Sequence, residues 1–118
     1  MEKPEIVTYI RLSVDTDQSE VNRIKKEIKL FSSMIEAKVM KEHWEILPKE
    51  SESGILDYVI DECMRYGWNI LSYDLKTVHY YVSGALSIIE DAADDHVAIF
   101  FVDPKSALQS IRDYETAR

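Results

Sequence analysis

The chain has 118 residues, of which 46% are hydrophobic and 31% charged, with three glycines and three prolines. This composition predicts one globular domain over residues 1–118, with no room for a second module. The longest apolar run, Val97 to Val102, is far too short to span a membrane. The amino terminus lacks the form of a signal peptide, and the single cysteine excludes an internal disulfide, so we expect a cytoplasmic protein.

The charge balance is acidic, with a formal net charge of −8 and a pI of about 4.8. Residues 54–118 hold 5 basic and 11 acidic side chains and so contribute −6 of the total. Such a surface repels phosphate backbones over a Debye length of ~8 Å. Direct nucleic-acid binding is therefore disfavoured and a protein partner is favoured, although solubility alone also explains the acidity.

The first half of the chain predicts two strands around one helix. We expect a strand over Ile6–Leu12, a turn over Asp15–Asp17, and a second strand over Ala37–Leu47 that Pro48 ends. Asp17 followed by Glu20 resembles a capping box at the start of the helix. The helix carries apolar residues at spacings of three and four, namely Val21, Ile24, Ile28, Phe31 and Ile35. Its other faces hold the only basic cluster, interpreted as a solvated surface: Arg23, Lys25, Lys26 and Lys29.

A second helix is expected over Ile55–Tyr66, with Ser53 as its cap and Gly67 as its end. Its predicted buried stripe consists of Leu56, Val59, Ile60, Cys63 and Met64, and its predicted outer face carries Asp57, Asp61 and Glu62. A third strand over Trp68–Tyr73 leads to Asp74.

The last third predicts a long helix, a strand and a short helix. Thr77 is expected to cap the long helix, which runs to Asp94; Gly84 inside it requires either a close helix–sheet contact or a break. The unbroken run Val97–Val102 predicts a strand covered on both faces. Asp103-Pro104 then begins a final helix through Tyr114.

The order βαβαβαβα predicts a three-layer α/β fold of the flavodoxin-like kind, with a four-stranded, mainly parallel sheet and helices on both faces. A ferredoxin-like arrangement is the alternative if the segment after Gly54 is not helical.

No cofactor or metal is predicted. The histidines His43, His79 and His96 are dispersed and lack metal-ligand spacing, and three glycines cannot form a nucleotide-binding loop. Acidic residues that could be imagined as metal ligands beside His96 are better interpreted as a solvated helix end. These acids and two tyrosines that precede them in the chain are the candidate protein-binding residues: Asp91, Asp94, Asp95, Tyr80 and Tyr81. For the tyrosines, packing in the core is the alternative.

The segment Tyr9-Ile10-Arg11-Leu12-Ser13, followed by an acidic turn and Gln18, resembles the start of the catalytic domain of serine recombinases, the resolvases and invertases. Ser53-Gly54 and the strand ending in Asp74 match later motifs, so the resemblance covers roughly residues 5 to 103. It implies a resolvase-like fold, with Ser13 as the nucleophile that attacks a DNA phosphate and Arg11 as a phosphate contact.

Two departures from the family pattern argue against catalysis. The family carries arginines at the first and fourth positions after the aspartate, where this chain has Leu75 and Val78, and Lys76 lacks the planar fork that clamps a phosphate. We also expect no recombinase-type DNA-binding domain. Ser13 and Arg11 are therefore interpreted as vestigial.

The resemblance and the departures together predict a non-catalytic, protein-binding regulator or inhibitor. Because the family travels with mobile elements, we expect it to be phage-encoded and to act on a host protein, for example in defence. Two alternatives stay open: a minimal DNA-cleaving enzyme that uses Ser13, and an acidic immunity or antitoxin protein that masks a basic nuclease. The sequence leaves homo-oligomerisation open.

Overall fold

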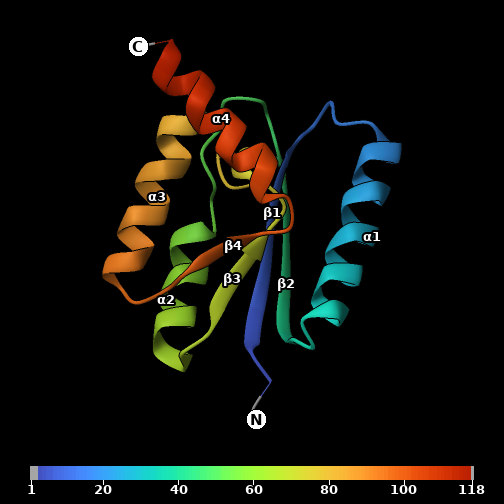
Figure 1. Cartoon of the computed structure of the whole chain (residues 1–118), viewed down its shortest axis with the longest axis vertical. Coiled ribbons are helices and arrows are strands. Elements are labelled where there is room, and N and C mark those ends of the chain that lie inside the picture. Colours follow the sequence, from blue (N-terminus) through green and yellow to red (C-terminus); the bar gives the residue numbers. More distant parts are fainter. Residues whose placement is uncertain (1–2, 118) are drawn as a thin grey trace.

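The computed structural model describes residues 3–117, which form three layers (Figure 1). The strands are β1 (Glu5–Ser13), β2 (Lys38–Leu47), β3 (Asn69–Ser72) and β4 (Ile99–Phe101). They form one sheet in the order β2-β1-β3-β4, and all three neighbouring pairs are parallel. The predicted parallel α/β fold is confirmed, and a helix does follow Gly54, which excludes the ferredoxin-like alternative.

The helices are α1 (Gln18–Met34), α2 (Leu56–Tyr66), α3 (Val82–Asp94) and α4 (Pro104–Thr116). Side chains of a strand alternate between the two faces of the sheet, and β1 has apolar residues on both. Ile6 and Ile10 pack with α1 on one face, whereas Val7 and Tyr9 pack on the other face with α2, α3 and α4. No described helix is long and apolar enough to cross a membrane.

The strand order creates the crevice that matters for function. From β1 the chain passes through α1 to β2 on one side, then returns through α2 to β3 on the other side of β1. The connections that follow β1 and β3 therefore diverge at the carboxyl ends of these strands. In open α/β sheets such a switch point is where ligands bind.

The long helix predicted from Thr77 is wrong. A 3-10 turn, η1 (Leu75–Thr77), is followed by an extended segment, and α3 begins only at Val82. Thr77 closes a turn that Asp74 caps. Gly84 marks neither the close helix–sheet contact nor the helix break that the sequence predicts. A Cβ at this position would instead lie 2.3 Å from Nδ1 of His79. The glycine makes room for this imidazole.

The strand predicted over Val97–Val102 is shorter and covered on one face only. β4 is the edge strand of the sheet, and Phe100 is 49% exposed. Phe100 pairs with Leu71, which faces the α1 side, so α1 does not extend over the sheet as far as β4. An apolar run without alternation is therefore not a reliable sign of burial on both faces.

Two residues of α2 differ from the prediction in their exposure to solvent. Met64, predicted to be buried, is half-exposed, and Glu62, predicted to be exposed, is buried. Glu62 accepts a hydrogen bond of 2.8 Å from Nζ of Lys41, which projects from β2 toward this helix. A cation on the neighbouring strand thus compensates the buried carboxylate.

The helix ends follow the sequence signals in part. Ser53 caps α2, since its Oγ accepts a 2.8 Å hydrogen bond from the N–H of Leu56. Gly67 ends α2 with φ of 74°, in the left-handed region. The capping box at α1 is wrong, because the side chain of Asp17 makes no cap hydrogen bond and Glu20 pairs with Arg23 instead.

The Thr77 hydroxyl holds η1 against β3, and its removal tests this turn. Its Oγ1 accepts from the N–H groups of Tyr73 (3.1 Å) and Asp74 (2.9 Å), donates to the Asp74 carbonyl (2.8 Å), and lies 2.8 Å from Oγ of Ser72. Thr77→Val keeps the shape of the side chain but leaves the hydrogen-bonding groups around it without a partner. Urea denaturation should therefore show a loss of about 2–4 kcal/mol in unfolding free energy. Thr77→Ser is the control and should lose about 1 kcal/mol or less. Equal stability of both variants would contradict this role.

Candidate functional site

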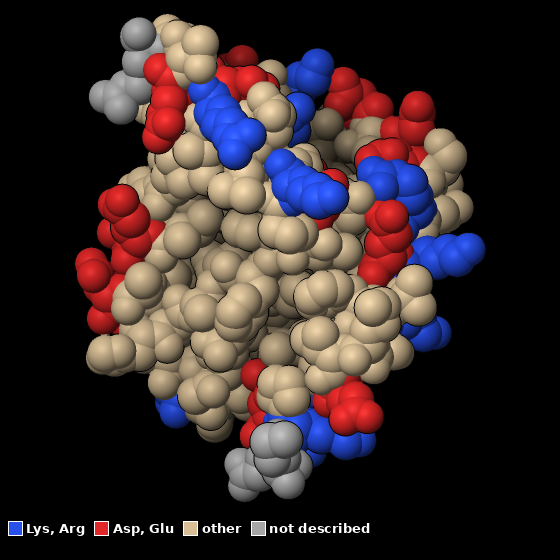
Figure 2. Space-filling model, viewed as in Figure 1, with Lys and Arg blue, Asp and Glu red and all other residues tan. Residues whose placement is uncertain are grey.

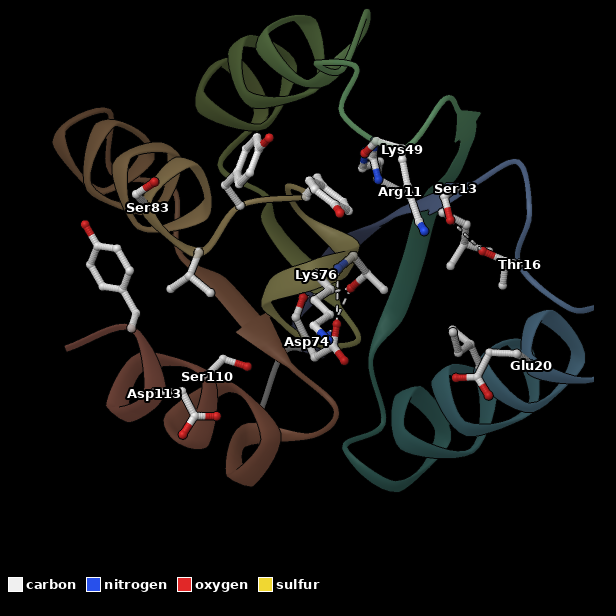
Figure 3. A pocket seen from close by; sticks show the side chains of 17 residues that line it. Arg11, Ser13, Thr16, Glu20, Lys49, Asp74, Lys76, Ser83, Ser110 and Asp113 are labelled. Carbon is white, nitrogen blue, oxygen red and sulfur yellow. Dashed lines mark hydrogen bonds between the residues drawn. The ribbon is translucent and has the colours of Figure 1, made fainter. Parts of the chain in front are cut away.

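A pocket of about 870 Å³ lies in the crevice at the carboxyl ends of β1 and β3 (Figure 3). Six parts of the chain line it, and two of them are the loop after β2, with Lys49, and the start of α3, with Val82 and Ser83. Arg11, Ser13 and Thr16 come from the end of β1 and its turn, and Glu20 from α1. Asp74, Lys76, Tyr80 and Tyr81 come from η1 and the segment before α3, and Ser110, Asp113 and Tyr114 from α4. The predicted pair Arg11 and Ser13 is thus placed where the sheet topology positions ligands.

Ser13 is the last residue of β1 and is partly exposed at this pocket. Its Oγ donates a 2.6 Å hydrogen bond to Oδ1 of Asp15 and lies 3.3 Å from Oγ1 of Thr16. The Ser13 hydroxyl lowers the pKa of Asp15, and the ammonium of Lys49, 3.6 Å from Oδ2, contributes in the same direction. The hydroxyl proton is therefore directed at a carboxylate that stays ionised.

Arg11 is used by the protein itself. The residue is only 3% exposed. Its Nη2 donates to three main-chain carbonyls in the loop after β2, those of Pro48 (2.9 Å), Lys49 (2.6 Å) and Ser51 (3.1 Å). The ring centroid of Tyr80 lies 5.9 Å from its Cζ on another side. The buried guanidinium thus fixes a loop, and a phosphate would have to compete with these carbonyls.

The positions after Asp74 supply no arginine-like group to the pocket. Leu75 and Val78 are both 1% exposed and belong to the core below α2 and α3. Of residues 75–78 only Lys76 is exposed, and it lines the pocket. With Arg11 and Lys49 it makes three cations, which are matched by three carboxylates: Glu20, Asp74 and Asp113. The lining therefore has no net positive charge with which to bind a phosphodiester.

Asp74 is also committed to the local fold. Its Oδ1 accepts a 3.1 Å hydrogen bond from the N–H of Thr77, which caps η1. Burial raises the pKa of Asp74 above its ordinary value, and the Thr77 hydrogen bond opposes that rise.

Glu45 of β2 is the residue that the sequence prediction missed. The Tyr9 hydroxyl donates to its Oε1 at 2.7 Å, Ser53 Oγ donates to the same oxygen, and the N–H of Gly54 donates to Oε2 at 3.1 Å. Burial raises the pKa of Glu45, but these hydrogen bonds outweigh it and leave the pKa below its usual range. Burial also raises the pKa of Tyr9. Glu45 of β2 lies directly opposite Arg11 of β1 in the sheet. The sequence predicts the length of strand two but not its register against β1, so this pairing could not be predicted.

The candidate protein-binding residues fall into two groups. Tyr80 and Tyr81 precede α3 and line the pocket, with their rings edge to face at 4.9 Å. Asp91, Asp94 and Asp95 lie at the other end of α3, a 13-residue helix that is ~20 Å long. The two groups therefore do not form one continuous surface. The described residues include no cluster of three or more potential metal ligands.

No family model and no curated protein sequence matches the chain. Two solved structures are similar over 96% of it. The C-terminal catalytic domain of ISC1926 TnpA, an IS607-like serine recombinase, has a TM-score of 0.69 and 17% identity, with 79% of that chain covered. The N-terminal catalytic domain of TP901-1 integrase has a TM-score of 0.65 and 14% identity, with 97% of that chain covered.

At these identities the similarity establishes architecture. It agrees with the strand order, the parallel sheet and the placement of helices on both faces. The chain has the resolvase-like α/β fold of serine recombinase catalytic domains.

Proposed function

We propose that this protein is a non-catalytic regulator or inhibitor that acts by binding another protein. The observation that carries the proposal is the commitment of Arg11, whose buried Nη2 is bonded to three main-chain carbonyls. Phosphoryl transfer relies on fixed positive charge around the phosphate, and loss of one preorganised donor can cost ~10²–10³ in rate. Here the family's phosphate contact is occupied and two more arginine positions are buried apolar residues.

The resolvase-like fold supports the finer part of the proposal. We infer a cytoplasmic protein encoded by a phage or another mobile element, which acts on a protein of its host, for example in defence. The identity of the neighbouring genes tests this origin directly. A basic nuclease encoded next to this chain, and bound tightly by it, would favour the immunity or antitoxin alternative instead.

One observation favours catalysis as the second candidate. Ser13 Oγ is partly exposed and hydrogen-bonded to Asp15, a carboxylate able to accept its proton during attack on a phosphate. Lys49 and Lys76 would then have to replace the missing arginines, and neither can offer a bidentate contact.

For docking, the two candidate groups define two separate surfaces. The left edge of the molecule in Figure 2 carries acidic side chains without basic ones, and α3 lies on this side. Such a surface suits a basic partner. Tyr80 and Tyr81 offer aromatic anchors at the pocket instead.

The absence of catalysis can be tested with supercoiled DNA and a general serine probe. We expect no SDS-stable protein–DNA species and no labelling of Ser13 by a fluorophosphonate. The reason is that the chain has Leu75 and Val78 where the family has the arginines that would stabilise a phosphate under attack. Mass spectrometry of the intact chain measures both. The matched control is Ser13→Ala, which should behave as the parent does. A covalent species that forms with the parent and disappears in Ser13→Ala would establish the enzyme alternative.

The docking surface can be tested by partner capture from the host followed by affinity measurement. Combined Asp91→Lys, Asp94→Lys and Asp95→Lys substitutions should weaken binding at least about tenfold, because they reverse charge at an exposed helix end. Asp57→Lys with Asp61→Lys reverses exposed charges on α2 and serves as the control. A Tyr80→Ala, Tyr81→Ala variant tests the pocket separately. Failure to capture any stable partner would contradict the proposed function.

A further inference from the structure

The strand β2 leaves a long edge of the sheet open. It runs for ten residues, and β1 is its only strand neighbour within residues 3–117. Five of its residues are exposed: Lys38, Val39, Lys41, Glu42 and Ile46. Main-chain N–H and C=O groups on the outer side of β2 therefore have no strand partner. Such an edge can accept an added strand, with main-chain hydrogen bonds providing affinity.

The neighbourhood of this edge is basic, unlike the rest of the chain. α1 and β2 together contain 6 basic and 4 acidic side chains, a net of +2, whereas the remaining residues contain 8 and 18, a net of −10. Lys25 reaches over β2, since its Nζ lies 5.3 Å from the ring centroid of Trp44. Figure 2 shows basic side chains, with acidic ones among them, along the side of the molecule where α1 lies. An acidic partner is therefore favoured at this edge.

A hollow of about 640 Å³ lies beside the edge, between the second half of α1 and the first half of β2. Lys29, Ser32 and Ser33 line it from the helix. In its lining the hydroxyl of Thr8 is fully buried and has no hydrogen-bond partner among the described residues. The ammonium of Lys29 at this hollow can attract a carboxylate of a partner. Glu42 is the only carboxylate residue of the lining.

The other face of the edge is aromatic. Lys41 projects toward α2 and pairs with Glu62 at 2.8 Å. Tyr58 and Tyr66, one turn before and one turn after Glu62, are 60% and 58% exposed. They therefore flank the point at which β2 meets α2. Aromatic surface of this kind favours apolar side chains of a partner.

We propose that the β2 edge binds an extended acidic segment of another protein, which adds a fifth strand to the sheet. Alternating side chains of that segment place carboxylates toward α1 and its hollow, and apolar groups toward Tyr58 and Tyr66. A second copy of β2 is a poorer occupant, because it would bring two regions of net +2 together. The β2 edge is separate from both docking surfaces proposed above, since none of residues 38–47 lines the pocket that holds Ser13 or belongs to the acidic end of α3.

The probe is the fluorescein-labelled peptide acetyl-(Glu-Val)5-amide, with acetyl-(Lys-Val)5-amide as its charge-reversed counterpart. Fluorescence anisotropy should show saturable binding of the first and none of the second. Lys25→Glu with Lys29→Glu should weaken binding about tenfold. Lys105→Glu with Arg112→Glu, exposed on α4, should leave it unchanged. No binding of the acidic probe, or equal binding of both probes, would overturn the proposal.

Backbone pairing is tested with two N-methylated probes and the parent protein. In a strand, the N–H groups of all Glu residues of this peptide point to one edge and those of all Val residues to the other. Strand addition therefore predicts that methylation of one set abolishes binding and methylation of the other leaves it intact. It also predicts slower amide hydrogen exchange in β2 of the complex. Equal behaviour of the two probes, protection elsewhere, or a β2-mediated dimer that excludes the probe would each overturn the proposal.

Discussion

The structure depends on how a positive charge is buried at the end of its central strand. Arg11 belongs to β1, which has strands on both sides and a helical layer on each face, and the residue is almost inaccessible to solvent. An unpaired buried charge costs several kcal/mol. The chain meets much of that constraint by folding the loop after β2 over the guanidinium. The carbonyls of Pro48, Lys49 and Ser51 accept hydrogen bonds from Nη2, whereas the buried Nε has no partner among the described residues. Glu45 holds the end of the same loop through Ser53 and Gly54.

In this arrangement the residues of the recombinase-like motifs have a structural role. Tyr9, Arg11 and Ser53 belong to the motifs that carry the resemblance, and here they connect β1, β2, the loop after β2 and the start of α2. Residues at the switch point of the sheet can thus serve as a structural framework for the loop after β2. The pocket remains, but its charges balance and its arginine is engaged. Protein binding, through the acidic end of α3 or the open edge of β2, is the activity that we propose for this molecule.

Much of the fold could be predicted because its signals are local. Alternating strands and helices, the Gly67 ending and the Ser53 cap depend on neighbouring residues, and the structure confirms them. The failures depend on contacts distant in sequence. Glu62 is buried because Lys41 lies opposite it, and Phe100 is exposed because α1 does not reach β4. The position of Arg11 and Ser13 could be predicted from topology, but the engagement of Arg11 by a loop some forty residues away could not.

The central claim is that the Arg11 guanidinium serves the loop and is not available to phosphate. Nitrogen-15 NMR of the arginine side chains during titration with duplex DNA, and with inorganic phosphate as a second ligand, measures this directly. The account predicts that the Arg11 Nη2 protons exchange slowly with water and that the Arg11 signals do not shift with either ligand. Rapid exchange together with a saturable shift of the Arg11 signals on addition of DNA would contradict it.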